Sequence, residues 1–247
     1  MHSTVGPGSS EAISRRLLVC NARDALDGYT PEIRDSYREG MVTARTGMMT
    51  RPSGSHRDHL VLAAIALTNR LADGWSGGVR YAAPEDADEC AAIANETCER
   101  FYRKQTAFLP AQAPELRTLA RRLHDVLLDL AADDIPVAIP KINALLAEHP
   151  AALHLSTEPP YSLHYQDHGM PAVQGWQVGC CAALASWVSS KSTQYIRRCD
   201  AAQCDRVFFD DTRSGTKRFC GPRCQDREKV RAYRLRKAVA DAGGTSR

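Results

Sequence analysis

The chain has 247 residues, of which 43% are hydrophobic and 25% are charged, and its formal net charge is +3. This composition is typical of a folded globular protein, and the length suits one sizeable domain with a small module. No run reaches the roughly 18 apolar residues of a membrane span, and the N-terminus has no apolar signal region. We therefore expect a cytoplasmic protein.

The two ends of the chain are predicted to be poorly ordered. Residues 1–57 should form a flexible leader, because Gly-, Ser- and Pro-rich stretches at residues 5–10 and 51–55 flank a polar middle. Segments of this kind bury too little apolar surface to offset the entropy lost on ordering. Residues 241–247 are predicted to be a disordered tail.

The central part, residues 58–192, is predicted to be a mainly helical body. From the spacing of apolar residues we expect helices over residues 59–71, 84–102, 114–132, 135–148 and 173–189. The third helix shows the clearest stripe, at Leu116, Leu119, Leu123, Val126, Leu127 and Leu130. Residues 74–81 are expected to be a glycine-rich loop with a short extended end.

One small β-hairpin is predicted near residues 152–166. Residues 152–156 and 161–166 are short alternating runs, and residues 157–160 between them favour a turn. The predicted fold is therefore mainly α with a small β-hairpin, in the α+β class. We find no phosphate-binding loop, nucleophile elbow or spaced carboxylate pair and expect no catalysis, with an enzyme in the helical body as an open alternative.

Four of the nine cysteines lie within 26 residues near the C-terminus. Four residues separate Cys199 from Cys204, three separate Cys220 from Cys224, and fifteen lie between the two pairs. Two close pairs joined by a short loop are the pattern of a tetrahedral zinc site. An iron–sulfur cluster and unligated thiols are the alternatives.

The expected ion is one structural Zn²⁺. A catalytic zinc keeps an open position and usually has a His or carboxylate ligand. Four thiolates would close the coordination shell, and no His follows His168.

A strongly basic segment surrounds the cysteines. Residues 197–237 carry 13 Lys and Arg against six Asp and Glu, a net charge of +7, which leaves −4 for the rest of the chain. This asymmetry indicates that one end of the chain binds a polyanion. Residues 207–209 favour a strand, residues 212–215 a turn, and residues 224–237 a basic helix.

The cysteine-rich segment resembles the CGNR-type zinc finger. Phe209 and Asp210 follow the second cysteine, a Thr-Arg-x-Gly turn covers residues 212–215, and Arg218-Phe219 leads into Cys220. The resemblance implies a small treble-clef-like finger over residues 193–240. In that family the finger follows a helical domain called ABATE, which residues 58–192 resemble more loosely, in proteins described as stress-induced transcriptional regulators of bacteria.

The chain departs from the motif for which this family is named. Cys-Gly-Asn-Arg is replaced by Cys224-Gln225-Asp226-Arg227. Asp226 places a negative charge in the first helical turn, which suits the helix dipole but repels a phosphate. A nucleic-acid contact made by the family's Asn is therefore not carried over.

These features predict a zinc-dependent, nucleoid-associated DNA-binding protein that regulates transcription. The finger is expected to have a mini-core of Val207, Phe208, Phe219, Val230 and Tyr233. Seven cations are expected to face duplex DNA: Arg213, Lys217, Arg218, Arg223, Arg227, Arg231 and Arg234.

The helical body is expected to form a homodimer, to sense a small molecule or to contact the transcription machinery. Two alternatives concern the finger, which could bind a protein or RNA instead of DNA.

Overall fold

The computed structural model describes residues 56–102 and 108–243, apart from residues 156, 158–160, 162, 167–168 and 213. The predicted leader lies outside the described residues, except that residues 56 and 57 already belong to helix α2 (His56–Leu71). At the other end, residues 241–243 of the predicted tail are helical, and residues 244–247 lie outside the described residues.

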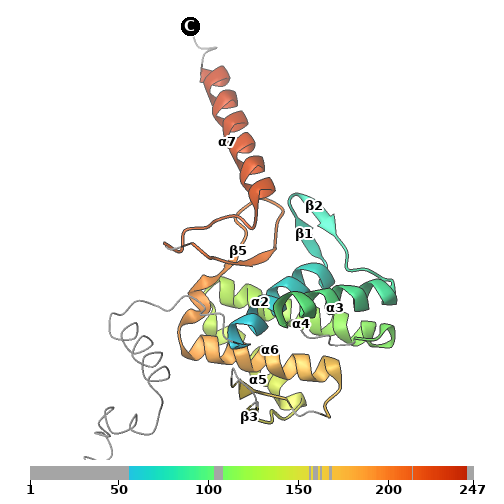
Figure 1. Ribbon diagram of the computed structural model, residues 1–247. Coiled ribbons are helices and arrows are strands. Elements are labelled where there is room, and N and C mark those ends of the chain that lie inside the picture. The colour runs from blue at the N-terminus through green and yellow to red at the C-terminus, as the bar shows by residue number, and fades with distance from the viewer. Residues whose placement is uncertain are drawn as a thin grey trace, which may run out of the picture. The chain divides into compact units, whose positions relative to one another are not determined.

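In the described part of the chain, five α-helices build the body in the order predicted from the sequence (Figure 1). They are α2, α3 (Ala87–Tyr102), α4 (Ala113–Ala131), α5 (Ile135–Glu148) and α6 (Ala172–Ser189). Helix α2 packs against α3, α4 and α6, while α5 packs against α4 and α6. All six apolar residues of the predicted stripe on α4 are buried, so the mainly helical prediction is confirmed.

Local sequence sets the junction between α4 and α5. Pro114 and Pro136 lie in the first turns of these helices, where a proline lacks only an N–H group that would be unpaired anyway. Between the helices, Asp133 has a left-handed φ of 59° and its N–H donates to the Leu130 carbonyl. This turn ends α4 and lets α5 fold back against it.

The region predicted to be a glycine-rich loop is a second hairpin. Strands β1 (Gly74–Ser76) and β2 (Val79–Tyr81) are antiparallel, with Trp75 opposite Arg80. Gly77 and Gly78 connect them with φ values of 60° and 86°, as a two-residue turn of the primed type requires. The predicted short extended end is present as β2, but the prediction missed the pairing. Strands of three residues show almost no alternation, although the Gly-Gly pair was a usable signal.

The predicted hairpin near residues 152–166 is present but shorter than expected. Strands β3 (His154–Leu155) and β4 (Leu163–His164) pair antiparallel. The His154 and His164 rings stack on one face with centroids 5.1 Å apart.

A third hairpin joins the body to the cysteine-rich segment. After the short helix η3 (Ser192–Tyr195), strand β5 (Ile196–Arg198) pairs antiparallel with β6 (Val207–Phe209). Ile196 and Val207 are buried in the core of the body. Val207 therefore belongs to that core and not to a mini-core of the finger, because β6 packs directly against α2 and α4.

The basic helix α7 (Pro222–Gly243) is longer than predicted at both ends. It begins two residues before Cys224, with Pro222 at its start, and extends past Lys237 as a straight helix that leaves the β5–β6 region (Figure 1). Val230 and Tyr233 are 49% and 62% exposed. Their predicted place in the mini-core is therefore wrong, and Phe208 and Phe219 pack against the cysteines without them.

Candidate metal centre

The four predicted ligands come from two segments of the finger. Cys199 and Cys204 flank the β5–β6 turn, in which Gln203 has a left-handed φ of 53°. Cys220 lies just before α7, and Cys224 lies in its first turn. All four sulfur atoms are within 4.8 Å of one another, so the structure brings the predicted set together.

The sulfur–sulfur distances fit a tetrahedral zinc site. Cys220 Sγ is 3.9 Å from Cys204 Sγ and 3.6 Å from Cys224 Sγ, and Cys224 Sγ is 3.8 Å from Cys204 Sγ. Zinc–sulfur bonds of about 2.3 Å in a regular tetrahedron place the sulfurs about 3.8 Å apart. A disulfide needs about 2.05 Å, so these cysteines are not bridged.

Backbone N–H groups surround two of the sulfurs. Cys199 Sγ accepts hydrogen bonds from the N–H of Cys220, at 3.4 Å, and from that of Ala201. Cys204 Sγ accepts from the N–H groups of Gly77 and Arg206. Such bonds favour the thiolate, which is the form that binds a metal.

The charges of the centre also require a cation. Burial raises the pKa of the Cys220 thiol, and the neighbouring Cys199 and Cys204 sulfurs raise it further. Burial acts in the same direction on Cys204, but the Gly77 and Arg206 backbone groups together with the Cys199 and Cys224 thiols outweigh it and leave its pKa below the ordinary value. Four crowded thiols can all ionise only when a positive ion compensates their charge, which is the role that Zn²⁺ would fill.

A comparison with known families agrees with this geometry. Residues 195–237 match the family model of the CGNR zinc finger. The CGNR zinc finger of this chain thus has four clustered cysteines that fit one structural zinc ion. No curated protein sequence matches the chain significantly. Within the described residues, no helix is long and apolar enough to cross a membrane.

Three of the seven predicted DNA-contacting cations lie on the loop before Cys220, and the structure describes two of them. Lys217 Nζ is 3.0 Å from Asp211 and 5.6 Å from the centre of the Phe208 ring. Arg218 Nε is 2.8 Å from Asp200. Arg213, on the same loop, lies outside the described residues.

Asp210 holds this loop in place. Its side chain is fully buried and accepts hydrogen bonds from the N–H groups of Thr212, at 3.0 Å, and Lys217, at 2.9 Å. Burial acts to raise the pKa of Asp210, but a hydrogen bond from the Thr212 hydroxyl, the two backbone bonds and the nearby Arg197 charge bring it below the ordinary value. The carboxylate is therefore ionised at neutral pH and fixes the backbone from which Lys217 projects.

The four predicted arginines of α7 differ in their surroundings. Arg227 is half-buried, and its Nη2 donates to the Ala202 carbonyl at 3.1 Å. Arg231 is 3.3 Å from Glu228. Arg223 and Arg234 are exposed and, among the described residues, have no ion pair.

Sequence reasoning missed the role of Glu228. Its Oε1 accepts a hydrogen bond from the Ala202 N–H at 2.8 Å, while the adjacent Arg227 binds the carbonyl of the same residue. From the first part of α7, the two side chains thus hydrogen-bond both the N–H and the carbonyl of Ala202 in the β5–β6 turn. They fix the direction of α7 relative to the cysteines.

Beyond the predicted set, Arg236 and Lys237 are exposed on α7 and also have no ion pair within the described part of the chain. Asp226, which replaces the Asn of the family motif, lies on the surface 3.3 Å from Lys229. Its charge is thus partly compensated within the helix.

Proposed function

We propose that this protein binds duplex DNA through its zinc finger and regulates transcription. The observation that carries the proposal is the solvent-exposed basic helix α7, on which four cations lack an acidic partner among the described residues: Arg223, Arg234, Arg236 and Lys237. Exposed cations on a helix of this kind are the common means of neutralising DNA phosphates.

The geometry of α7 supports a groove-binding role. Arg223 and Arg234 are eleven residues apart and lie on nearly the same face of the helix, about 16 Å apart along its axis. Helix α7 has the width that a DNA major groove admits, and cations at both ends of one face would reach phosphates that border the groove. The ion pairs of Lys217, Arg218 and Arg231 are on the surface, where such pairs are weak enough to exchange for phosphates.

We infer that the helical body acts by binding and not by catalysis. The described cavity at its junction with the finger has a volume of only about 10 Å³, far below the usual size of a small-molecule site. In this proposal the body forms a dimer, senses a signal or contacts the transcription machinery.

The test is binding of the zinc-loaded full-length protein to a fluorescent random-sequence duplex at about 50 mM salt, where electrostatic binding is strong. We expect measurable affinity that falls at least tenfold in the double variant Arg223→Ala/Arg234→Ala. The matched control is Arg100→Ala/Arg121→Ala, which removes the same charge from exposed positions of α3 and α4.

Absence of binding by the zinc-loaded protein would overturn the proposal and favour an acidic protein partner for α7. RNA would be favoured instead if, in competition, an RNA hairpin displaces the fluorescent duplex at a lower concentration than unlabelled duplex DNA does. Equal losses in the two double variants would show that the affinity reflects net charge and not α7.

A further inference from the structure

The β1–β2 hairpin, which belongs to the helical body, contacts the metal-binding turn of the finger. Gly78 donates its N–H to the Gln203 carbonyl at 3.0 Å, and Asp205 donates its N–H to the Trp75 carbonyl at 3.1 Å. The Trp75 N–H in turn donates to the Asp205 carboxylate at 2.9 Å. Residues on both sides of Cys204 are thus bonded to the hairpin.

Cys204 itself lies beside the hairpin as well. The backbone of Gly77, at the tip of the β1–β2 turn, acts to lower the pKa of the Cys204 thiol. The body therefore contributes to the surroundings of a sulfur that would ligate zinc. Partners of metal ligands usually come from the immediate surroundings of the site and orient the ligand.

The glycines of this hairpin leave space for finger side chains. A Cβ on Gly74 would lie 2.6 Å from both carboxylate oxygens of Asp205, and a Cβ on Gly78 would lie 2.4 Å from Arg227 Nη2. The backbone of Gly74 does not need glycine for its φ, so the close contact with Asp205 is what excludes a side chain there. The absence of side chains thus allows the finger to approach the hairpin backbone.

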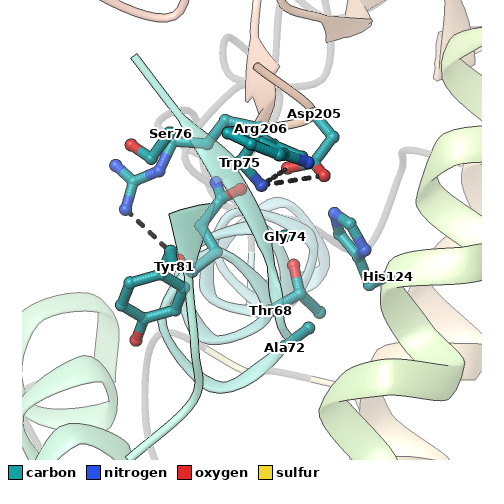
Figure 2. A pocket seen from close by; sticks show the side chains of 10 residues that line it. Thr68, Ala72, Gly74, Trp75, Ser76, Tyr81, His124, Asp205 and Arg206 are labelled. Atoms are coloured by element: carbon teal, nitrogen blue, oxygen red, sulfur yellow. Dashed lines mark hydrogen bonds between the residues drawn. The ribbon is translucent and has the colours of Figure 1, made fainter. Parts of the chain in front are cut away.

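The close view of the junction shows the same arrangement (Figure 2). Asp205 points back to the Trp75 backbone, and His124 of α4 faces the same hollow from the body side. Arg206 passes Ser76 and donates to the Asn69 carbonyl at 3.2 Å. Side chains from α2, α4, the hairpin and the finger therefore meet in one small region beside Cys204.

Arg227 covers the turn of the hairpin from the other side. Its guanidinium lies over Gly78 and donates to the Ala202 carbonyl, while its Nη1 is buried without a hydrogen-bond partner. An unpaired buried N–H group costs free energy, so this position is maintained by the contacts that surround it. A guanidinium held in this way is not available as a simple phosphate contact.

We propose that the β1–β2 hairpin is the outer shell of the zinc centre, with its backbone bonded to Gln203 and Asp205 on the two sides of Cys204. Arg227 is the positioning residue that clamps the hairpin to the finger. Metal binding and folding of the helical body are then thermodynamically linked. A zinc ion that binds the assembled centre stabilises the body, and a displaced hairpin weakens zinc binding. The proposal does not depend on DNA binding.

The first measurement is zinc affinity of the full-length protein, by competition with a chromophoric chelator. We expect Gly74→Ala to weaken zinc binding about 10- to 100-fold, the range found when partners of metal ligands are removed. Gly169→Ala is the control, because its added Cβ meets no atom within 4 Å. Wild-type affinity in Gly74→Ala would overturn the proposal.

A second pair of variants separates the clamp from backbone strain. Gly78 and Gly215 both have positive φ, but only Gly78 has a neighbour, Arg227, within 4 Å. We expect Gly78→Ala to weaken zinc binding more than Gly215→Ala does. In the Arg227→Ala background, Gly78→Ala should reduce zinc affinity only by the amount that its φ strain causes. If the double variant loses as much zinc affinity as the two single variants together, the clamp is contradicted.

A third measurement keeps the proposal testable even if a variant folds poorly. The three tryptophans, Trp75, Trp176 and Trp187, all lie in the body, and the last two are buried in its core. Their fluorescence during thermal unfolding of the wild-type protein should report a lower Tm after chelation of zinc. An identical Tm of the body with and without zinc would show that the finger binds metal independently of the hairpin.

Discussion

Asn69 on α2 makes two hydrogen bonds to the backbone of Val207 on β6. Its Nδ2 donates to the Val207 carbonyl at 2.7 Å, and its Oδ1 accepts from the Val207 N–H at 3.2 Å. The side-chain amide thus continues the strand pairing of β6 on the side away from β5. This pair ties the first hairpin of the finger to the first described helix of the body.

Removing this amide should loosen the junction. We expect Asn69→Ala to lower the free energy of unfolding by about 1–3 kcal/mol, because both backbone groups of Val207 lose a partner in a part-buried place. Zinc affinity should fall as well.

Asn95 is a natural control, since it makes the same two hydrogen bonds to the backbone of Phe108 within the body, at 3.0 and 2.8 Å. Asn95→Ala should destabilise the body to a similar extent, with less effect on zinc affinity, as measured by urea unfolding and chelator competition. Equal losses of zinc affinity in both variants would contradict the assigned role of Asn69.

The metal content tests the four-thiolate centre. We expect about one zinc per chain by elemental analysis, and Cys220→Ser should retain far less, because three ligands do not close the tetrahedron. Cys90→Ser, which changes a buried cysteine of α3 outside the cluster, should keep its zinc. Full zinc content in Cys220→Ser would remove this cysteine from the site. A protein that contains iron and sulfide would contradict the assignment of zinc.

The small core of the finger should depend on Phe208 and not on Tyr233. Phe208 is 7% exposed and packs against the cysteines, whereas Tyr233 is 62% exposed on α7. We expect Phe208→Ala to cost about 3–5 kcal/mol of stability and Tyr233→Ala to change it by no more than about 0.5 kcal/mol. Thermal unfolding of the zinc-loaded variants measures both. A large loss in Tyr233→Ala would indicate that α7 packs against another part of the protein.

The ion pair of Glu148 and Arg122 should make the stability of the body depend on pH. Hydrogen bonds from Arg122 and Gln177 lower the pKa of Glu148 from 4.5 to about 2. Because the pKa of Glu148 is lower in the folded protein, the ionised carboxylate stabilises the fold above its ordinary pKa. This stabilisation is lost as the pH falls toward 2. The pair is partly exposed, so we expect Glu148→Gln to lose only about 1 kcal/mol at pH 7 and nearly nothing at pH 2. Glu99→Gln, an exposed α3 position without an ion pair among the described residues, should show no such pH dependence in urea unfolding. A loss of equal size at both pH values would contradict the assignment.

Much of the body could be predicted because its helices carry their own pattern. The six apolar residues from Leu116 to Leu130 recur at helical spacing, and burial of one side of α4 follows from that spacing alone. The ligand cysteines were predictable for a similar reason, since the spacing within each pair is set by the local geometry of a metal site.

The junction could not be predicted because its contacts join segments far apart in the chain. The strands around Gly77 and Gly78 are too short to show a pattern, and their pairing with the finger depends on Asp205 and Gln203. For the same reason, helical spacing places Arg227 on the same face as Arg223 and Arg234, but does not show that a glycine turn of the body lies beneath it. Helical spacing also does not show that Val230 and Tyr233 face solvent, because that depends on what packs beside α7.

The salt dependence of DNA affinity tests the proposed function most directly. For the zinc-loaded full-length protein we expect log affinity to fall with log salt concentration at a slope near −4. Four unpaired cations of α7 would each neutralise a phosphate and release about 0.9 counterion. Arg234→Ala should reduce the magnitude of this slope by about one, whereas Arg227→Ala should leave it unchanged while zinc is bound. No affinity at about 50 mM salt, or a slope near zero, would contradict the proposal that α7 binds DNA phosphates.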